Sequence, residues 1–120
     1  MRKAAISVVT EDGQDAGKAR KLAVAMVDVL GLDWQIVRIE KYHKFEDAFK
    51  IELECILQED DICKINQWSV SGSDKIASPW LLYFDDDEQS IELIFNRNEH
   101  SRERKAEFRL IRWVHWQIIR

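Results

Sequence analysis

The spacing of hydrophobic residues changes twice in the N-terminal third of the chain, and each change predicts a new element. Residues 4–9 ("AAISVV") are apolar and β-branched, which is typical of a buried strand. Residues 14–30 repeat apolar side chains at three- and four-residue steps, which predicts an amphipathic helix that Gly31 ends. Residues 34–42 alternate as a second strand does. We therefore expect a β-α-β opening, with the two strands parallel and the helix on one face.

Residues 45–57 ("FEDAFKIELECIL") fit two periods at once. One set of apolar positions matches a helix, while Ile51, Leu53 and Cys55 alternate as in a strand. The early acidic residues suit a helix N-terminus, so we predict a second helix here and keep the strand as the alternative.

The rest of the chain is predicted to be mostly strand. Residues 61–70 ("DICKINQWSV") are predicted as a strand, followed by a loop at residues 71–79. Two apolar runs around a polar tip predict a hairpin at residues 80–95. Residues 108–120 are apolar on both faces, which predicts a long strand covered from both sides, after a polar connector or short helix at residues 100–106.

These elements together predict one α+β domain covering residues 1–120. It opens β-α-β and continues with a second helix and a mostly antiparallel sheet. That sheet contains the hairpin at residues 80–95 and the long C-terminal strand.

Composition narrows the classes of function. The chain has 120 residues, of which 46% are hydrophobic and 33% charged, and its net charge is −4. A net negative charge does not suit a protein whose main task is to hold nucleic acid, because binding phosphates requires basic residues. No apolar stretch approaches the roughly 20 residues that a membrane-spanning helix needs, and the basic start leads only into a short apolar run. We therefore expect a cytoplasmic protein without a membrane partner.

Residues 11–20 ("EDGQDAGKAR") look at first like a phosphate-binding loop. That motif needs two glycines separated by four residues, then lysine, then serine or threonine. Here the glycines are separated by three residues, alanine follows the lysine, and three acidic residues would repel phosphate. We expect no nucleotide site, and instead expect Asp12 or Asp15 to cap the helix.

Histidine and cysteine are placed without any metal-binding or catalytic spacing. His43, His100 and His115 are far apart, and Cys55 and Cys63 are eight positions apart. Both cysteines lie in apolar runs and are expected to be reduced thiols. We predict no metal, no cofactor and no catalytic residue, and we expect that the protein is not an enzyme.

Charge is distributed unevenly along the chain. Residues 61–96 contain seven acidic residues and two lysines, whereas residues 97–120 contain seven basic and three acidic residues. The two segments can pair internally or present faces of opposite sign. Four consecutive acids at the hairpin tip exceed what a turn needs, which favours either protection of the hairpin or contact with a basic partner. The hairpin acids are Asp85, Asp86, Asp87 and Glu88, and Glu59, Asp60 and Asp61 are candidates to join them.

Five tryptophans are unusually many for a chain of this length. Trp68 and Trp80 flank the loop at residues 71–79 and are expected to be half exposed, where they either close the core or serve as interface residues. The C-terminal segment interleaves arginine with aromatic residues, as platforms for single-stranded nucleic acid do. Arg109, Trp113 and His115 would share one strand face, but the acidic net charge argues against this function.

In overall character the chain resembles the immunity proteins of bacterial contact-dependent growth inhibition and related polymorphic toxin systems. The likeness rests on "YFDDDEQSIELIF", "LQEDDICKINQW" and "IRWVHW". Such proteins are cytoplasmic and cover the active site of a cognate toxin domain, often a basic nuclease. The resemblance implies a one-to-one complex of a monomer, in which the acids named above replace nucleic-acid phosphates and an aromatic side chain fills a pocket.

The alternative is a secretion chaperone or regulatory homodimer that associates through an apolar strand or helix face. A small enzyme and a binder of single-stranded nucleic acid rank below both. Sedimentation distinguishes the first two, because the toxin-binding hypothesis predicts a monomer.

Overall fold

The computed structural model describes residues 2–31 and 33–119 and contains one six-stranded, fully antiparallel sheet. Its strands lie in the order β2-β3-β1-β8-β6-β5. The elements follow the chain as β1 (Arg2–Thr10), α1 (Ala16–Leu30), β2 (Gln35–Lys41), β3 (Phe49–Leu57), α2 (Ile62–Asp74), β4 (Ala77–Ser78), β5 (Leu81–Asp85), β6 (Ser90–Asn96), β7 (Arg102–Glu103), a 3-10 turn (Ala106–Leu110) and β8 (Ile111–Ile119). Strands β4 and β7 form a separate two-stranded ladder. This is the expected α+β class.

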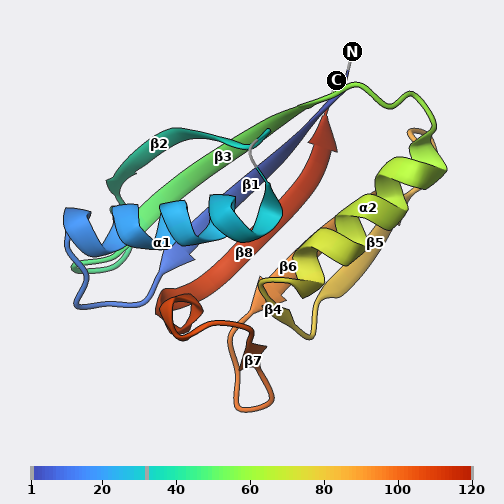
Figure 1. Cartoon of the computed structure of the whole chain (residues 1–120). Helices are drawn as coiled ribbons and strands as arrows, with labels where there is room; N and C mark the ends of the chain where they lie inside the picture. The colour runs from blue at the N-terminus through green and yellow to red at the C-terminus, as the bar shows by residue number, and fades with distance from the viewer. Residues whose placement is uncertain (1, 32, 120) are drawn as a thin grey trace.

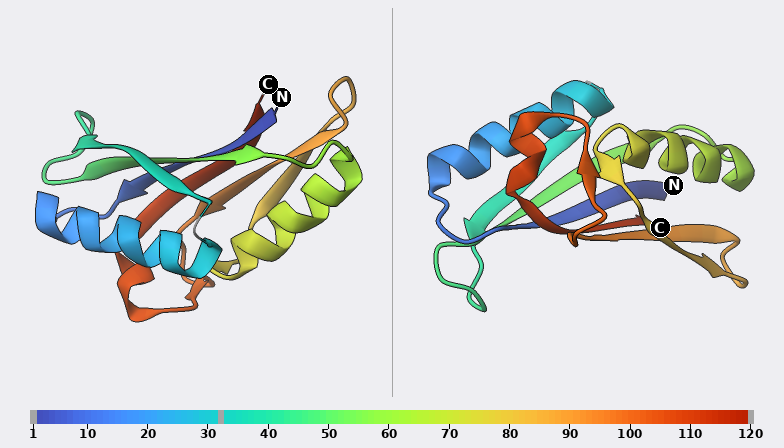
Figure 2. Two further views of the ribbon diagram at one scale, coloured as in Figure 1. Left: turned by 45° about the horizontal axis from the view of Figure 1, so that its top comes forward. Right: turned by 90° about the horizontal axis from the view of Figure 1, so that it is seen from below.

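Both helices lie on the same face of the sheet, and the opposite face is open (Figures 1 and 2). Along β1, the alternate residues Ala4, Ile6 and Val8 are buried toward the helices. The residues between them lie on the open face, where β3 contributes lysine and glutamate side chains that pair with one another or with β1. Neither described helix has the length and apolar character needed to cross a membrane.

Helix α1 is confirmed: it ends at Leu30 as predicted and begins at Ala16, two residues after the predicted start. The Asp15 side chain accepts a hydrogen bond from the Lys18 N–H at 2.9 Å, which satisfies one of the free donors of the first turn. Gly31 ends the helix with a φ of 122°, a conformation that favours glycine. Of the two expected caps, Asp15 is therefore the one that caps the helix, whereas Asp12 pairs with Arg112.

The β-α-β opening is present, but its two strands are not neighbours. Strand β3 lies between β1 and β2 and is antiparallel to both, so β1 and β2 run in the same direction with one strand between them. Helix α1 covers one face of the sheet, as predicted for the helix of this unit (Figure 1).

The prediction of a helix at residues 45–57 is wrong, because most of this segment is β3. Ile51, Leu53 and Cys55 are buried against the helices, while Lys50 and Glu52 alternate with them on the open face. The two-residue period therefore decided the structure, since a strand between two neighbours buries every second side chain.

The prediction of a strand at residues 61–70 is also wrong, because α2 occupies Ile62–Asp74. Asp61 caps this helix by accepting a hydrogen bond from the Cys63 N–H at 2.9 Å. The buried face consists of Ile65, Ser69, Gly72 and Ser73. Small residues form most of that face, because the helix packs closely. The hydrophobic pattern of the sequence therefore gave no indication of this helix.

The hairpin and the long C-terminal strand are confirmed as β5–β6 and β8. Strand β8 begins at Ile111, because Ala106–Leu110 forms the 3-10 turn that buries Phe108. It is central in the sheet, as expected. It is covered on one face only, and Trp113 and His115 lie on the open face beside residues of β6. The expectation of cover on both sides is therefore corrected.

Three tryptophans pack together where α2 meets the sheet. Trp34 and Trp68 stack with ring centres 5.7 Å apart, and Trp116 meets both rings edge to face. Trp34 and Trp116 are buried, and their indole N–H groups donate no hydrogen bond to any residue that the structure describes. Gly72 of α2 lies against the Trp116 ring, where a Cβ atom would approach within 2.7 Å. The glycine thus allows the helix to approach the tryptophan.

Candidate partner-binding surface

The tip of the β5–β6 hairpin is built from its own acidic residues. The Asp85 carboxylate accepts hydrogen bonds from the N–H groups of Asp87 and Glu88, at 2.9 and 3.1 Å. Gln89 completes the turn with a φ of 58°. Asp85 therefore shapes the turn, whereas the side chains of Asp86 and Asp87 are exposed.

The second acidic segment precedes α2. One carboxylate oxygen of Glu59 accepts hydrogen bonds from the N–H groups of Asp60 and Asp61, at 3.0 and 3.2 Å. Asp61 caps the helix through Cys63. Negative charge at this position complements the positive end of the helix dipole, so these acids have a structural role as well as an exposed position.

The fold brings the two acidic segments together at one end of the molecule. Asn66, one turn into α2, donates to the Gln89 carbonyl at 2.9 Å and accepts from the Ile91 N–H at 3.1 Å. The start of α2 and the hairpin tip lie at the same end in all three views (Figures 1 and 2). We call this region the acidic end, and it consists of Glu59, Asp60, Asp61, Asp85, Asp86, Asp87 and Glu88.

Few basic groups offset the acidic end. Lys64 lies 3.8 Å from Glu59, and the Arg2 side chain donates to the main-chain carbonyl of Asp60. Within the described residues, no ion pair involves Asp85, Asp86 or Asp87. The hairpin tip therefore presents negative charge to the solvent.

The basic C-terminal segment is in contrast paired within the protein. Arg97, Arg104, Arg109 and Arg112 all form ion pairs with acids outside the hairpin, namely Glu11, Asp12, Asp74 and Glu103. Of the two arrangements that the charge pattern allowed, internal pairing therefore holds for these four arginines, whereas Asp85, Asp86 and Asp87 form no ion pair with any described residue. Arg109 lies in the 3-10 turn rather than on β8, so it does not share a strand face with Trp113 and His115.

Glu103 pairs with both Arg97 and Arg109, and we expect this carboxylate to make an acid-sensitive contribution to stability. Hydrogen bonding from Arg109, with a further contribution from Arg97, holds the pKa of the Glu103 carboxyl below its usual value. Stability from this group is therefore present above the carboxyl pKa of the unfolded chain and is lost as the pH falls through the lower, folded-state pKa. We expect Glu103→Gln to lower the urea midpoint at neutral pH and to flatten its fall toward acid.

The control for this measurement is Glu107→Gln, on the neighbouring exposed glutamate. It should leave both the midpoint and its pH dependence close to those of the unmodified protein. Equal acid dependence in the two variants would contradict the role of Glu103.

Strand β5 exposes an unusual run of large hydrophobic residues. Leu81, Leu82, Tyr83 and Phe84 are 54%, 53%, 51% and 52% exposed, although successive residues point to opposite faces. Leu82 and Phe84 are exposed because α2 packs over β6 and leaves the outermost strand uncovered, whereas Leu81 and Tyr83 lie on the open face of the sheet. We call these four residues the apolar edge, and they lead directly into the acidic tip.

The two candidate tryptophans contribute to packing inside the protein. Trp80 donates its indole N–H to the carbonyls of Ser73 and Ala77, at 3.1 and 2.7 Å, and its ring contacts Phe95. Trp68 belongs to the stacked cluster with Trp34. Both are partly buried, as expected, and both close an end of the core.

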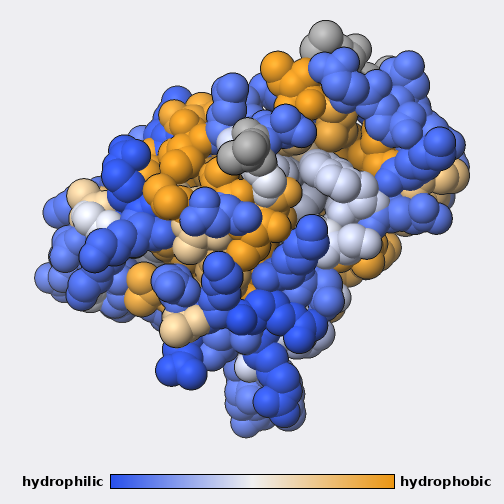
Figure 3. All heavy atoms as spheres, in the orientation of Figure 1, coloured by the Kyte–Doolittle hydropathy of each residue, from blue (hydrophilic) through white to orange (hydrophobic). Residues whose placement is uncertain are grey.

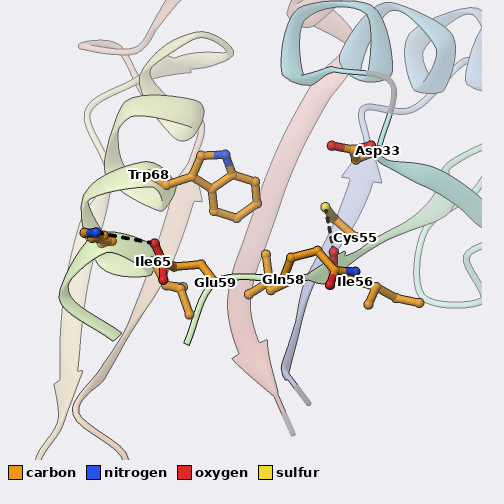
Figure 4. A pocket seen from close by; sticks show the side chains of 9 residues that line it. Asp33, Cys55, Ile56, Gln58, Glu59, Ile65 and Trp68 are labelled. Atoms are coloured by element: carbon orange, nitrogen blue, oxygen red, sulfur yellow. Dashed lines mark hydrogen bonds and ion pairs between the residues drawn. The ribbon is translucent and has the colours of Figure 1, made fainter. Parts of the chain in front are cut away.

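Trp68 also lines a hollow of about 360 Å³ between α2 and the end of β3. Ile65 and Trp68 form one wall, and Cys55 and Asp33 lie opposite (Figure 4). Figure 3 shows near-neutral and hydrophobic atoms at the surface between the two helices. Burial, together with the Asp33 carboxylate, raises the pKa of the Cys55 thiol. This thiol is therefore protonated at neutral pH and is a poor nucleophile.

The histidines lie apart from this hollow. His115 pairs with Glu92 on the open face of the sheet, and exposed His100 lies beside Glu99. His43 contacts the ring of Tyr42 in the connection between β2 and β3. Among the described residues, no group of three or more histidine, cysteine, aspartate or glutamate side chains has the arrangement of a metal site.

Comparison with known proteins adds no relative. No family model matches this chain, and searches of curated proteins and of solved structures gave no significant match. The surface of the protein is therefore the basis on which we infer its function.

The apolar edge is the feature that sequence reasoning missed. The run at residues 80–84 predicts a hairpin strand, and that prediction did not include the exposure of Leu81–Phe84. One signal was available, because Leu81–Phe84 lacks the polar alternation of a strand with one solvent-exposed face.

Proposed function

We propose that this protein binds a basic protein partner through the acidic end and the adjoining apolar edge. The observation that carries the proposal is the convergence of two acidic segments beside exposed hydrophobic side chains, at a place where few internal bases neutralise them. Hydrophobic side chains next to charge are typical of protein interfaces, where charge steers association and apolar burial holds the complex together.

The partner class follows from the resemblance of the chain to polymorphic-toxin immunity proteins. The partner is a cognate toxin domain, a basic nuclease, whose nucleic-acid groove attracts carboxylates as it attracts phosphates. A monomer of this chain binds one toxin molecule and covers its active site, in the cytoplasm of the cell that makes both.

The test captures the partner with matched charge variants. Immobilised protein is exposed to a lysate of the source cell, alongside Asp86→Lys/Asp87→Lys and the control Glu46→Lys/Glu99→Lys. The control changes net charge equally, on exposed acids outside the acidic end. We expect a basic protein to be retained by the unmodified chain and the control, and its association rate at low salt to fall about tenfold or more for the hairpin variant.

The captured protein is then purified and its nuclease activity titrated with this chain. Complete inhibition at one equivalent is the expected result. Nuclease activity that persists at one equivalent would refute the neutralising role, and equal association rates for the two charge variants would refute the electrostatic contact.

The second candidate, a regulatory or secretion-chaperone homodimer, is favoured by the apolar edge alone. A half-exposed large side chain leaves roughly 100 Å² accessible, so the four residues offer roughly 400 Å² per molecule. A stable interface buries about 800 Å² on each partner. Self-association through this edge alone would therefore be weak, and a dimer that sedimentation detects at micromolar concentration would favour the second candidate.

A further inference from the structure

The two outer strands of the sheet differ in how they are protected. Strand β2 carries Arg38, Glu40 and Lys41, and its pairing with β3 has an irregularity between Ile36 and Arg38. Charges and irregular pairing are the usual protection of an edge strand against further pairing. Strand β2 therefore has the features of a strand that remains an edge.

Strand β5 has none of these features before the hairpin tip. Its register with β6 is continuous from Leu81 to Asp85, without a bulge, and its first four residues are apolar. No other strand pairs with it in the part of the chain that the structure describes. Alternate N–H and C=O groups along its outer side are therefore available for another strand.

Hydrophobic side chains are available on both faces of this edge. Leu81 and Tyr83 lie on the open face, since they pair with Ile94 and Glu92. Leu82 and Phe84 pair with the buried residues Leu93 and Ile91, and so lie on the helix side. Val70, 44% exposed, is one turn along α2 from Asn66, which binds the hairpin. An added strand would thus find apolar contacts above and below the sheet.

We propose that β5 is a docking edge for an extended segment of a basic protein, which adds a seventh strand to the sheet. This rests on the proposed function for the choice of a basic partner. The segment pairs antiparallel to β5 along Leu81–Asp85 and places apolar side chains on both faces. Because the pairing is antiparallel, lysine or arginine residues that face the acidic tip come immediately before the apolar run of the segment.

A second copy of this chain fits the edge less well. In a symmetric antiparallel pairing centred between Leu82 and Tyr83, Asp85 lies opposite Trp80 of the other copy. The residues beyond it, Asp86 and Asp87, lie opposite Pro79 and Ser78. No base faces these acids, and the proline has no N–H to donate. A basic segment satisfies both the apolar and the charged part of the edge.

The test uses synthetic peptides as probes of the intact, isotope-labelled protein. The designed probe is Lys-Lys-Lys-Val-Val-Thr-Val-Val, which places valine on both faces of the added strand. One control carries the lysines after the same run. Another replaces two adjacent residues in the middle of the run with proline; because successive N–H groups point to opposite sides, one of the two prolines removes a ladder hydrogen bond to β5. Amide shifts are followed by NMR at low salt. We expect shifts at Leu81–Asp85 and affinity at least about tenfold higher than for the proline peptide.

The charge part is tested with Asp86→Asn/Asp87→Asn, which keeps the turn hydrogen bonds to Asp85. This variant should lose the preference for lysine before the run and should keep its discrimination against proline. Equal affinity for the proline peptide, or shifts confined to the open face or the helices, would overturn strand addition. A stable dimer that buries β5 without peptide would overturn the choice of occupant.

Failure of this inference and failure of the proposed function give different results. If the peptide binds at β5 but a captured nuclease is not inhibited, the docking edge is supported and the toxin-neutralising function is refuted. If a captured nuclease is inhibited but the peptide causes no shifts at β5, the toxin-neutralising function is supported and strand addition at β5 is refuted.

Discussion

Gly72→Ala is expected to destabilise the protein by about 1–3 kcal/mol, the usual cost of overpacking a well-packed core. Alanine in place of glycine inside a helix normally stabilises by about 1 kcal/mol, so the expected sign is the reverse of the helix propensity. The reason is the Trp116 ring, whose Cη2 atom lies 2.7 Å from the position of the added Cβ. Urea unfolding followed by tryptophan fluorescence measures the change.

The matched control is Gln67→Ala, at an exposed position of α2. It should be neutral or slightly stabilising, because it changes helix propensity without touching the tryptophan cluster. A Gly72→Ala variant as stable as this control would show that α2 does not pack on Trp116 as described.

Arg97→Met is expected to lower the free energy of unfolding by about 2–4 kcal/mol, since hydrogen bonds from a charged group contribute about 1.5–3 kcal/mol each. The Arg97 side chain donates to the carbonyls of Ile111 and Phe108, at 2.6 and 2.8 Å, and lies 3.4 Å from Glu103. These contacts hold the 3-10 turn and the start of β8 against the end of β6. Methionine keeps the apolar stem and leaves both carbonyls without this donor.

Arg102→Met removes the same charge from an exposed residue whose side chain makes none of these contacts. It should change the free energy of unfolding by less than about 0.5 kcal/mol, as most surface substitutions do. An equal loss in the two variants would assign the effect to net charge rather than to the buried contacts of Arg97.

The elements that sequence predicted well are those whose signals are local. The Asp15 side chain caps the start of α1, and the backbone conformation of Gly31 ends this helix. At the hairpin tip, the Asp85 side chain accepts a hydrogen bond from the N–H of Asp87 within the turn itself. Such signals depend on neighbours within a few residues. They are therefore readable before any tertiary contact is known.

The two errors have a common physical cause. In β3, a helical set of apolar positions overlaps the alternating set, and only the two neighbouring strands decide between them. In α2, the buried face is formed largely by Ser69, Gly72 and Ser73, which a hydrophobic pattern does not register. Both segments depend on what packs against them, which a single sequence does not contain.

The candidate surface was predictable in its charges and not in its shape. The acids of the hairpin and of the segment before α2 stand out in the sequence, but their proximity depends on Asn66 bridging α2 and β6. The exposure of Leu82 and Phe84 depends on α2 covering β6 rather than β5. The long-range placement of one helix thus contributes to both the acidic and the apolar part of the surface.

The order of strands in the sheet also has a consequence for synthesis of the protein. Strand β8 lies between β1 and β6, and its register with β1 joins Lys3 to Ile119. A nascent chain that ends at Asn96 can form β2-β3-β1 and the β5–β6 hairpin, but it lacks the strand that joins them. Until β8 leaves the ribosome, two more hydrophobic strand edges stay open, and this is the period in which the growing chain is most exposed to aggregation and to chaperones.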